Sequence, residues 1–161
     1  MITVTSIEIN AKPEQVWSWI WDEDKIEQWV ENLVGAETIE QVPGEVGSTF
    51  KNTFSENGKE FVMEGVVNSY NEYTDYEISL TGSMFDLTIG YVLEDLGSSV
   101  RATQTSNITK LKGFFKLMAP LFWFMKSKAC KDQIKMMEWM KELCEAESNT
   151  AETDESPAEE F

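Results

Sequence analysis

The sequence predicts an α+β domain in which a curved antiparallel sheet of about seven strands wraps around one long C-terminal helix, with two short helices after the first strand. Three observations predict this architecture. Apolar and polar residues alternate in segments up to Thr109, turn signals separate these segments, and one long amphipathic segment follows from Gly113 to about Ala146. Each predicted strand has a polar and an apolar face, and only the C-terminal helix is long enough to cover the apolar faces.

The first predicted elements are a strand and two short helices. Residues 2–10 alternate and are rich in β-branched side chains, which is typical of a strand. Pro13 suits the first turn of a helix, and Glu14 is favourable near the positive end of the helix dipole. A second short helix is expected over residues 23–30, with Asp22 as its cap. The first helix is indicated by apolar residues at helical spacing, namely Val16, Trp17, Ile20 and Trp21.

Residues 33–109 contain the remaining strands, separated by turns rich in glycine, asparagine and proline. Asn57-Gly58 is the strongest of these turn signals, because both residues accept positive φ. Alternate side chains of each strand form its apolar face, and these side chains are expected to line the interior of the curved sheet. They include Phe50, Asn52, Phe54, Met63, Tyr76, Ile78, Leu87, Ile89, Tyr91 and Gln104.

The predicted C-terminal helix carries one continuous apolar stripe at three- and four-residue steps. Pro120 interrupts the pattern, which predicts a kink or a separate first turn near residues 117–120. The stripe has two interpretations. It is ordinary core, or its first part lines a ligand pocket that the flexible side chain of methionine would suit. The residues of that first part are Met118, Phe122 and Met125.

The distribution of charge bears on domain limits and partners. The net charge of −16 argues against nucleic acid, because a phosphate backbone needs a basic surface. Residues 147–161 are acidic, which predicts a disordered tail after a ligand-binding domain over residues 1–146.

The stretch Lys110–Lys141 is either a docking surface for an anionic membrane or the polar face of an amphipathic helix, and the acidic total favours the second. Membrane contact is therefore the less favoured interpretation. Apolar residues that would assist docking are Phe114, Leu117, Leu121 and Trp123.

Missing residue types restrict the chemistry of the chain. It has no histidine, which excludes Ser-His and Cys-His nucleophile pairs and His-ligated zinc. Cys130 and Cys144 fall in one predicted helix about 21 Å apart, too far for a disulfide. We expect no metal, no cofactor and no catalytic residue. Unpaired thiols and the lack of an export signal favour the cytoplasm. The acids of the strands fall on polar faces, namely Glu60, Glu64, Asp75 and Glu77.

One N-terminal stretch resembles a known superfamily. It runs Ile9-Asn10-Ala11-Lys12-Pro13-Glu14-Gln15-Val16-Trp17, with Asp22 and Trp29 following, and is similar to the START/SRPBCC superfamily. That superfamily groups START lipid-transfer domains, birch-pollen-allergen-like proteins and polyketide cyclase/dehydrase and lipid-transport proteins. The resemblance covers about residues 2–146 and implies the helix-grip fold, with a cavity between the sheet and the C-terminal helix and Trp29 at its rim. Such cavities accept lipids, polyketides, hormones or quinones, and only some members are enzymes.

The expected function is the binding or carriage of a small apolar molecule such as a lipid, isoprenoid or polyketide. The alternatives are a cyclase or dehydratase acting in the same cavity, and an interaction module with a vestigial cavity. Several enzymatic members use cavity histidines or acids paired with arginine, but Arg101 is predicted to face outward, which lowers the enzyme interpretation. The inward polar groups of Asn52, Gln104, Tyr76 and Tyr91 either orient a ligand or bond to one another, to water or to backbone. The sequence leaves the oligomeric state open.

Overall fold

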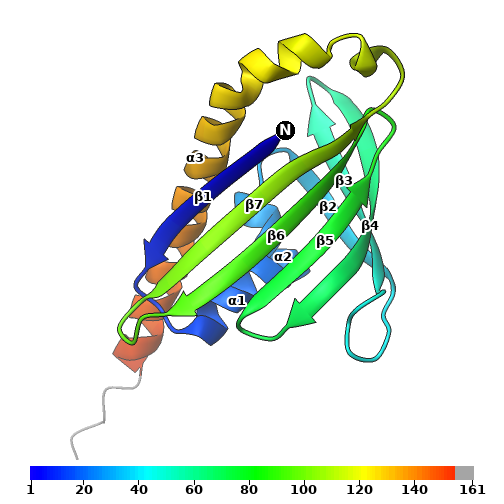
Figure 1. Ribbon diagram of the computed structural model, residues 1–161. Helices are drawn as coiled ribbons and strands as arrows, with labels where there is room; N and C mark the ends of the chain where they lie inside the picture. Colours follow the sequence, from blue (N-terminus) through cyan, green and yellow to red (C-terminus); the bar gives the residue numbers. More distant parts are fainter. Residues whose placement is uncertain (155–161) are drawn as a thin grey trace, which may run out of the picture.

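The computed structural model describes residues 1–154, which form one sheet and three α-helices. Its elements in chain order are β1 (Ile2–Ile9), α1 (Pro13–Trp21), α2 (Glu23–Trp29), β2 (Leu33–Glu40), β3 (Thr49–Glu56), β4 (Lys59–Asn71), β5 (Asp75–Thr81), β6 (Phe85–Asp95), β7 (Val100–Leu111), the 3₁₀ turn η1 (Gly113–Lys116) and α3 (Ala119–Asp154). The strands are antiparallel, in the order β1-β7-β6-β5-β4-β3-β2. Figure 1 shows the sheet curving around α1 and α2, with α3 alongside β1. The predicted fold class is confirmed.

The β3–β4 hairpin shows how local sequence sets the register of the sheet. Asn57 and Gly58 both have positive φ, 51° and 75°, and the flanking residues Glu56 and Lys59 are paired. This is the two-residue turn that the Asn-Gly pair predicts. The same register places Phe50 opposite Gly65 and Phe54 opposite Phe61. The aromatic side chains of β3 therefore lie on the concave face.

Irregular pairing contributes to the curvature of the sheet. The register shifts between Val67 and Ser69 in β4 and between Asp86 and Leu87 in β6. An extra residue at such a bulge bends a strand and increases its twist. The extra residues are Asn68 in β4 and Thr109 in β7, so these two strands bend there, and alternate side chains of β3, β5 and β6 face the space beneath α1 and α2.

The C-terminal half of α3 belongs to the core. It packs against β1, α1 and α2, and its Met137, Met140 and Cys144 side chains are almost fully buried. Gln133 is also buried, where its amide nitrogen donates to the carbonyl of Gln104 at 2.9 Å and its carbonyl accepts from the hydroxyl of Thr3. These two bonds attach the middle of α3 to β7 and β1 at the edge of the sheet.

The N-terminal part of α3 behaves differently. Pro120 lies in the first turn of the helix, where its missing N–H is tolerated, and η1 forms a separate turn before it. Of the two outcomes predicted for this proline, the separate turn is the one observed. Every residue from Ala119 to Lys128 is exposed except Phe122, which is half-buried. Within residues 1–154, no helix combines the length and apolarity needed to cross a membrane.

The end of α3 extends past the expected domain limit at residue 146. The helix continues to Asp154, because residues 147 and 148 make tertiary contacts that composition does not reveal. Glu147 accepts hydrogen bonds from the indole of Trp19 at 2.6 Å and from Lys25 at 2.9 Å. Ser148 is buried against α1, where its hydroxyl donates to Gln15. The predicted disordered tail therefore does not begin at 147, and its remainder lies outside the described residues.

Candidate ligand-binding cavity

A cavity of about 620 Å³ lies between the α1–α2 helices and the strands from β2 to β6. This volume falls within the ordinary range of small-molecule sites. Exposed residues at its rim, including Glu23, Glu37 and Gln41, show that the cavity opens to solvent between α2 and β2. No residue of α3 lines it. The roof is thus formed by the two short helices and not, as expected, by the long one.

The walls of the cavity are aromatic and aliphatic. Strands β5 and β6 supply the floor through two directly opposed pairs, Tyr76 with Tyr91 and Ile78 with Ile89. Strand β3 supplies one side. The roof comes from one face of the helices and the residues that follow them, and consists of Ile20, Trp21, Ile26, Trp29, Val30 and Leu33. Trp29 is fixed there by a hydrogen bond from its indole to the carbonyl of Trp19 at 2.8 Å.

A close approach between β3 and β4 shapes one wall. The ring of Phe50 covers Gly65, and a β-carbon at Gly65 would overlap that ring. Gly65 therefore lets Phe50 lie flat against the sheet and leaves the space in front of it open. Further along the strand, Phe54 stacks on Phe61 with ring centroids 5.3 Å apart, which holds a second aromatic side chain against the wall.

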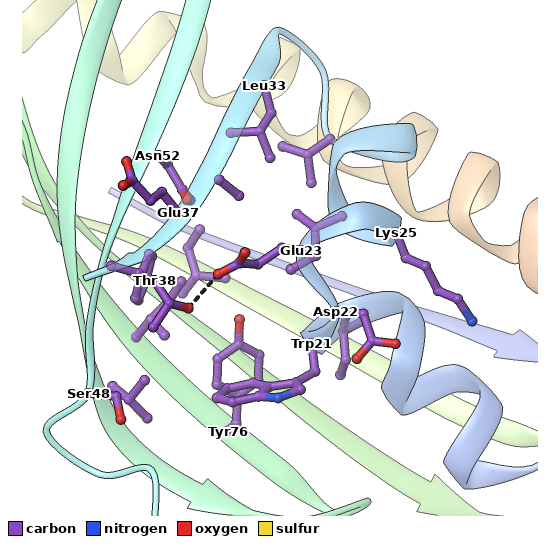
Figure 2. A pocket seen from close by; sticks show the side chains of 18 of the residues that line it. Trp21, Asp22, Glu23, Lys25, Leu33, Glu37, Thr38, Ser48, Asn52 and Tyr76 are labelled. Atoms are coloured by element: carbon purple, nitrogen blue, oxygen red, sulfur yellow. Dashed lines mark hydrogen bonds between the residues drawn. The ribbon is translucent and has the colours of Figure 1, made fainter. Parts of the chain in front are cut away.

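The polar groups deep in the cavity are two tyrosine hydroxyls. Tyr76 and Tyr91 are at least nine-tenths buried, and their rings stack 5.5 Å apart. No hydrogen bond joins either hydroxyl to another group of residues 1–154, and neither is among the side-chain polar atoms that are sealed from solvent. Figure 2 shows the hydroxyl of Tyr76 turned into the cavity. Burial raises the pKa of both phenols well above the ordinary value, so both stay neutral and can donate one hydrogen bond each.

The rim of the cavity is acidic. Five carboxylates line it, from Asp22, Glu23, Asp24, Glu37 and Glu45, against a single lysine, Lys25. That lysine points away from the cavity (Figure 2) and is bonded to Ser18 and Glu147. No cation in the described part of the chain therefore faces the interior of the cavity.

Two hydrogen bonds fasten α2 to the edge strand β2 beside the opening. The carboxylate of Glu23 accepts from the hydroxyl of Thr38, as Figure 2 shows, and Glu27 accepts from the backbone N–H of Ala36 at 2.8 Å. The backbone donor at Ala36 would otherwise be unpaired on the open edge of β2. These bonds fix the position of α2 over the cavity and narrow its mouth.

The sequence-based site residues divide into two groups. The residues from that set which lie on the cavity walls are Trp29, Phe50, Asn52, Phe54, Tyr76, Ile78, Ile89 and Tyr91. Met63 and Leu87 belong to the packed layer around the cavity and do not line it. Gln104 is buried near α3, with its side-chain carbonyl unpaired within the described residues and its backbone bonded to Gln133.

Met118, Phe122 and Met125 do not lie in this cavity, so the expected contribution of α3 is corrected. Met118 and Phe122 are half-buried and Met125 is exposed, because α3 packs against the sheet only beyond this first part. The site predicted from the sequence did not include the acidic rim or, apart from Trp29, the helical roof. The spacing of Ile26, Trp29 and Val30, three and four residues apart, is the signal that indicates an apolar face on α2.

A curved antiparallel sheet gripping helices over an apolar cavity defines the helix-grip class of proteins. The chain belongs to the polyketide cyclase/dehydrase and lipid transport family, whose sequence profile matches residues 1–135. A comparison with curated protein sequences finds no match.

Solved structures share this fold at low sequence identity. The protein TTHA0849 from Thermus thermophilus superposes with a TM-score of 0.71 at 14% identity, covering 92% of this chain and 99% of that one. The ZhuI aromatase/cyclase from Streptomyces sp. R1128 gives 0.71 at 11% identity, covering 90% and 93%. A START superfamily protein from Mycobacterium smegmatis gives 0.68 at 16% identity, covering 93% and 98%.

Proposed function

We propose that this protein binds and carries a small apolar molecule in the cavity beneath α1 and α2, in the cytoplasm. The observation that carries the proposal is the cavity itself, with aromatic and aliphatic side chains on its inner walls and Tyr76 and Tyr91 on its floor. Because the cavity opens to solvent, water can occupy it and bond to the tyrosine hydroxyls when no ligand is bound. A ligand that replaces this water gains about 25 cal/mol for each Å² of apolar surface that it buries, and it can accept a hydrogen bond from a tyrosine. The two free thiols, Cys130 and Cys144, suit a reducing compartment.

The position of the hydroxyls suggests the shape of the ligand. Tyr76 and Tyr91 lie on the floor, and the aliphatic side chains of Ile78, Leu80 and Ile89 lie on the same two strands. A matching ligand has an apolar body and one oxygen atom, carbonyl or hydroxyl, that reaches the floor. Asn52, on the wall of β3, offers a second polar contact nearer the rim.

The acidic rim adds a charge preference to this proposal. A ligand carboxylate at the mouth of the cavity would meet Asp22, Glu23 and Glu37. Among the described residues that line the cavity no free cation offsets them, because Lys25 is paired with Glu147. Like charges at about 4 Å repel by roughly 4 kcal/mol at the effective dielectric constant of a protein surface. We therefore expect the ligand to be neutral or cationic, such as a long-chain alcohol, ketone or amine, and not a free fatty acid.

Native mass spectrometry of the purified protein, followed by titration with a matched ligand pair, tests this function. Dodecanol and dodecanoate share one alkyl chain and differ in the charge of the head group. We expect a co-purifying apolar molecule or saturable binding of dodecanol, and binding of dodecanoate at least about tenfold weaker at neutral pH. Failure of every apolar compound to bind would remove the carrier proposal, whereas equal binding of both would remove only the charge preference.

A second candidate function is a cyclase or dehydratase reaction on a chain folded in the same cavity. It is favoured by one observation, that the carboxylate of Glu23 and the hydroxyl of Tyr76 are turned into the same space (Figure 2). In such a reaction Glu23 would accept a proton from carbon, and Tyr76 would donate a hydrogen bond to the enolate oxygen. Turnover of a bound polyketone that is lost in Glu23→Gln, with binding retained, would support the enzyme over the carrier.

A further inference from the structure

One end of the molecule carries a cluster of exposed apolar side chains that the fold does not use. We call residues 113–128, which comprise η1 and the first turns of α3, the aromatic arm. Leu117 is 79% exposed, Trp123 74% and Phe124 73%. Other exposed apolar side chains of the arm are Phe114, Leu121 and Met125. Figure 1 shows the arm (yellow) beyond the N-terminal start of β1.

The exposure of the arm is not that of an ordinary amphipathic helix. Residues 119–125 are apolar at every position, so the helix has no polar face there, and only Phe122 is half-buried. A helix that is apolar all round normally lies in a protein core or in contact with lipid. Contiguous exposed apolar surface marks an interaction site. The arm therefore needs a partner that the described chain does not supply.

The charge of this region is opposite to that of the rest of the protein. Residues 110–135 contain seven lysines and one acidic residue, Asp132, a net of +6, so the remainder must carry −22 to reach the total of −16. Only Lys112 and Lys128 form ion pairs within the described residues. The lysines without an ion pair there are Lys110, Lys116, Lys126, Lys131 and Lys135.

Some of these lysines meet the aromatic residues in a groove. It has a volume of about 520 Å³ and lies between the arm and the end of β7. Lys110, Lys116 and Lys126 line it together with Phe122 and Trp123, and no acidic residue does. Lysine ammonium groups next to aromatic side chains suit a molecule that has an anionic head group and an attached hydrocarbon chain.

We propose that the aromatic arm docks this protein on the surface of an anionic phospholipid bilayer. Leu117, Trp123 and Phe124 enter the boundary between head groups and acyl chains, where tryptophan is favoured, and the lysines contact the head groups. Stable interfacial binding takes both an apolar and a basic element, and the arm has both. The acids of the sheet do not cancel this attraction, because at physiological ionic strength charges are screened beyond about 8 Å.

Flotation of the full chain with lipid vesicles tests the proposal. We expect binding to vesicles of equal parts phosphatidylcholine and phosphatidylglycerol, and little to phosphatidylcholine alone. Lys116→Gln and Lys126→Gln should each weaken binding about fivefold, because one basic residue near an anionic surface contributes about 1 kcal/mol. Phe124→Ser should weaken it by at least about tenfold, and bound protein should show a blue shift in fluorescence that Trp123→Phe removes.

Matched controls separate the arm from general surface effects. Ile39→Ser removes an apolar side chain that is 59% exposed on β2, and Lys59→Gln removes an exposed lysine at the β3–β4 turn. Both variants should bind vesicles like the unmodified protein. All of the substituted side chains are exposed, so folding is retained and circular dichroism verifies it.

Two results would overturn the proposal. One is equal affinity for the two kinds of vesicle together with no loss in the lysine variants. The other is a dimer in analytical ultracentrifugation that Phe124→Ser dissociates, with no vesicle binding by either form, which would identify a second copy of the chain as the occupant of the arm. Neither result bears on the cavity, because ligand binding there is measured without lipid.

Discussion

The ring of Phe50 lies over the Cα of Gly65 on the concave face of the sheet, in the place that a β-carbon at residue 65 would need. The side chain of Phe50 borders the cavity, so this glycine sets how much space remains in front of β3.

Gly65→Ala should reduce ligand binding by moving Phe50. The new methyl group forces the ring off the sheet and into the cavity, which removes volume from the site. We expect a loss of affinity for dodecanol and a destabilisation of about 1–3 kcal/mol, as for other overpacked positions. Calorimetric titration and urea unfolding measure the two effects. Gly90→Ala is the control, since its β-carbon would have its nearest neighbours at 4.0 Å. Unchanged affinity in Gly65→Ala would show that Phe50 does not border the bound ligand.

Tyr76→Phe should have opposite effects on stability and on binding. The hydroxyl faces the cavity and makes no hydrogen bond within residues 1–154, so its removal leaves the free energy of unfolding unchanged or slightly higher. Binding of dodecanol should weaken by about 1 kcal/mol, roughly fivefold, while binding of dodecane stays the same. Tyr73→Phe, an exposed tyrosine outside the cavity, is the control. If Tyr76→Phe weakened the binding of dodecanol and of dodecane by the same factor, the ring of Tyr76 and not its hydroxyl would determine the affinity.

Glu147 should contribute to stability although it lies beyond the expected end of the domain. Glu147→Ala removes the acceptor of the Trp19 indole and of Lys25. Because Glu147 is more than a third exposed, we expect a loss of only about 1–2 kcal/mol, mostly from the charged hydrogen bond to Trp19. Chemical denaturation measures it. Glu152→Ala, in the next turns of the same helix and exposed, should have no effect. Equal stability of the two variants would contradict the assigned role.

The two cysteines should differ in reactivity. Burial raises the pKa of the Cys144 thiol from 9.0 to about 12, so it stays protonated at neutral pH. Cys130 is half-buried at the start of the packed part of α3. Ellman's reagent should therefore modify Cys130 first and Cys144 only on unfolding, and Cys130→Ser should abolish the early phase. Two thiols reacting at one rate in the native protein would refute this.

The raised Cys144 pKa also has a consequence for stability. A group that holds its proton more tightly when folded stabilises the folded state fully below its unfolded pKa, near 9, and this contribution is lost as pH rises toward the folded pKa of about 12. The free energy of unfolding should fall over this interval. Cys144→Ala should reduce the slope, while the buried tyrosines maintain part of it. A pH-independent unfolding free energy between 9 and 12 would be inconsistent with burial of these groups.

Local sequence predicts the sheet because its signals are short-range. The Asn57-Gly58 turn fixes one hairpin, and the period of two on β3 and β5 identifies which side chains face inward, including Phe50 and Tyr76. Those signals do not depend on where distant segments lie, which is why most of the cavity floor follows from the sequence.

The helices require information that periodicity does not contain. Met118, Phe122 and Met125 have the spacing of a packed stripe whether the helix lies on the sheet or projects from it. Likewise, Glu147 reads as part of an acidic tail until its contacts with Trp19 and Lys25 are seen. The roof of the cavity depends on how α2 is held to β2, through Thr38 and Ala36, and this is a tertiary relationship.

Gln133 attaches α3 to the sheet, so the parts of the helix before and after this residue should open with different free energies. Between Gln133 and Ser148 its amides should exchange with solvent mainly when the core opens, whereas the turns from Ala119 to Lys128 are almost entirely exposed. Deuterium uptake should therefore be fast near Trp123 and slow near Met140, with the step close to Gln133. The first turns of α3 can unfold and refold without disturbing the rest of the protein. The free-energy cost of exposing their aromatic side chains to water therefore affects only these turns.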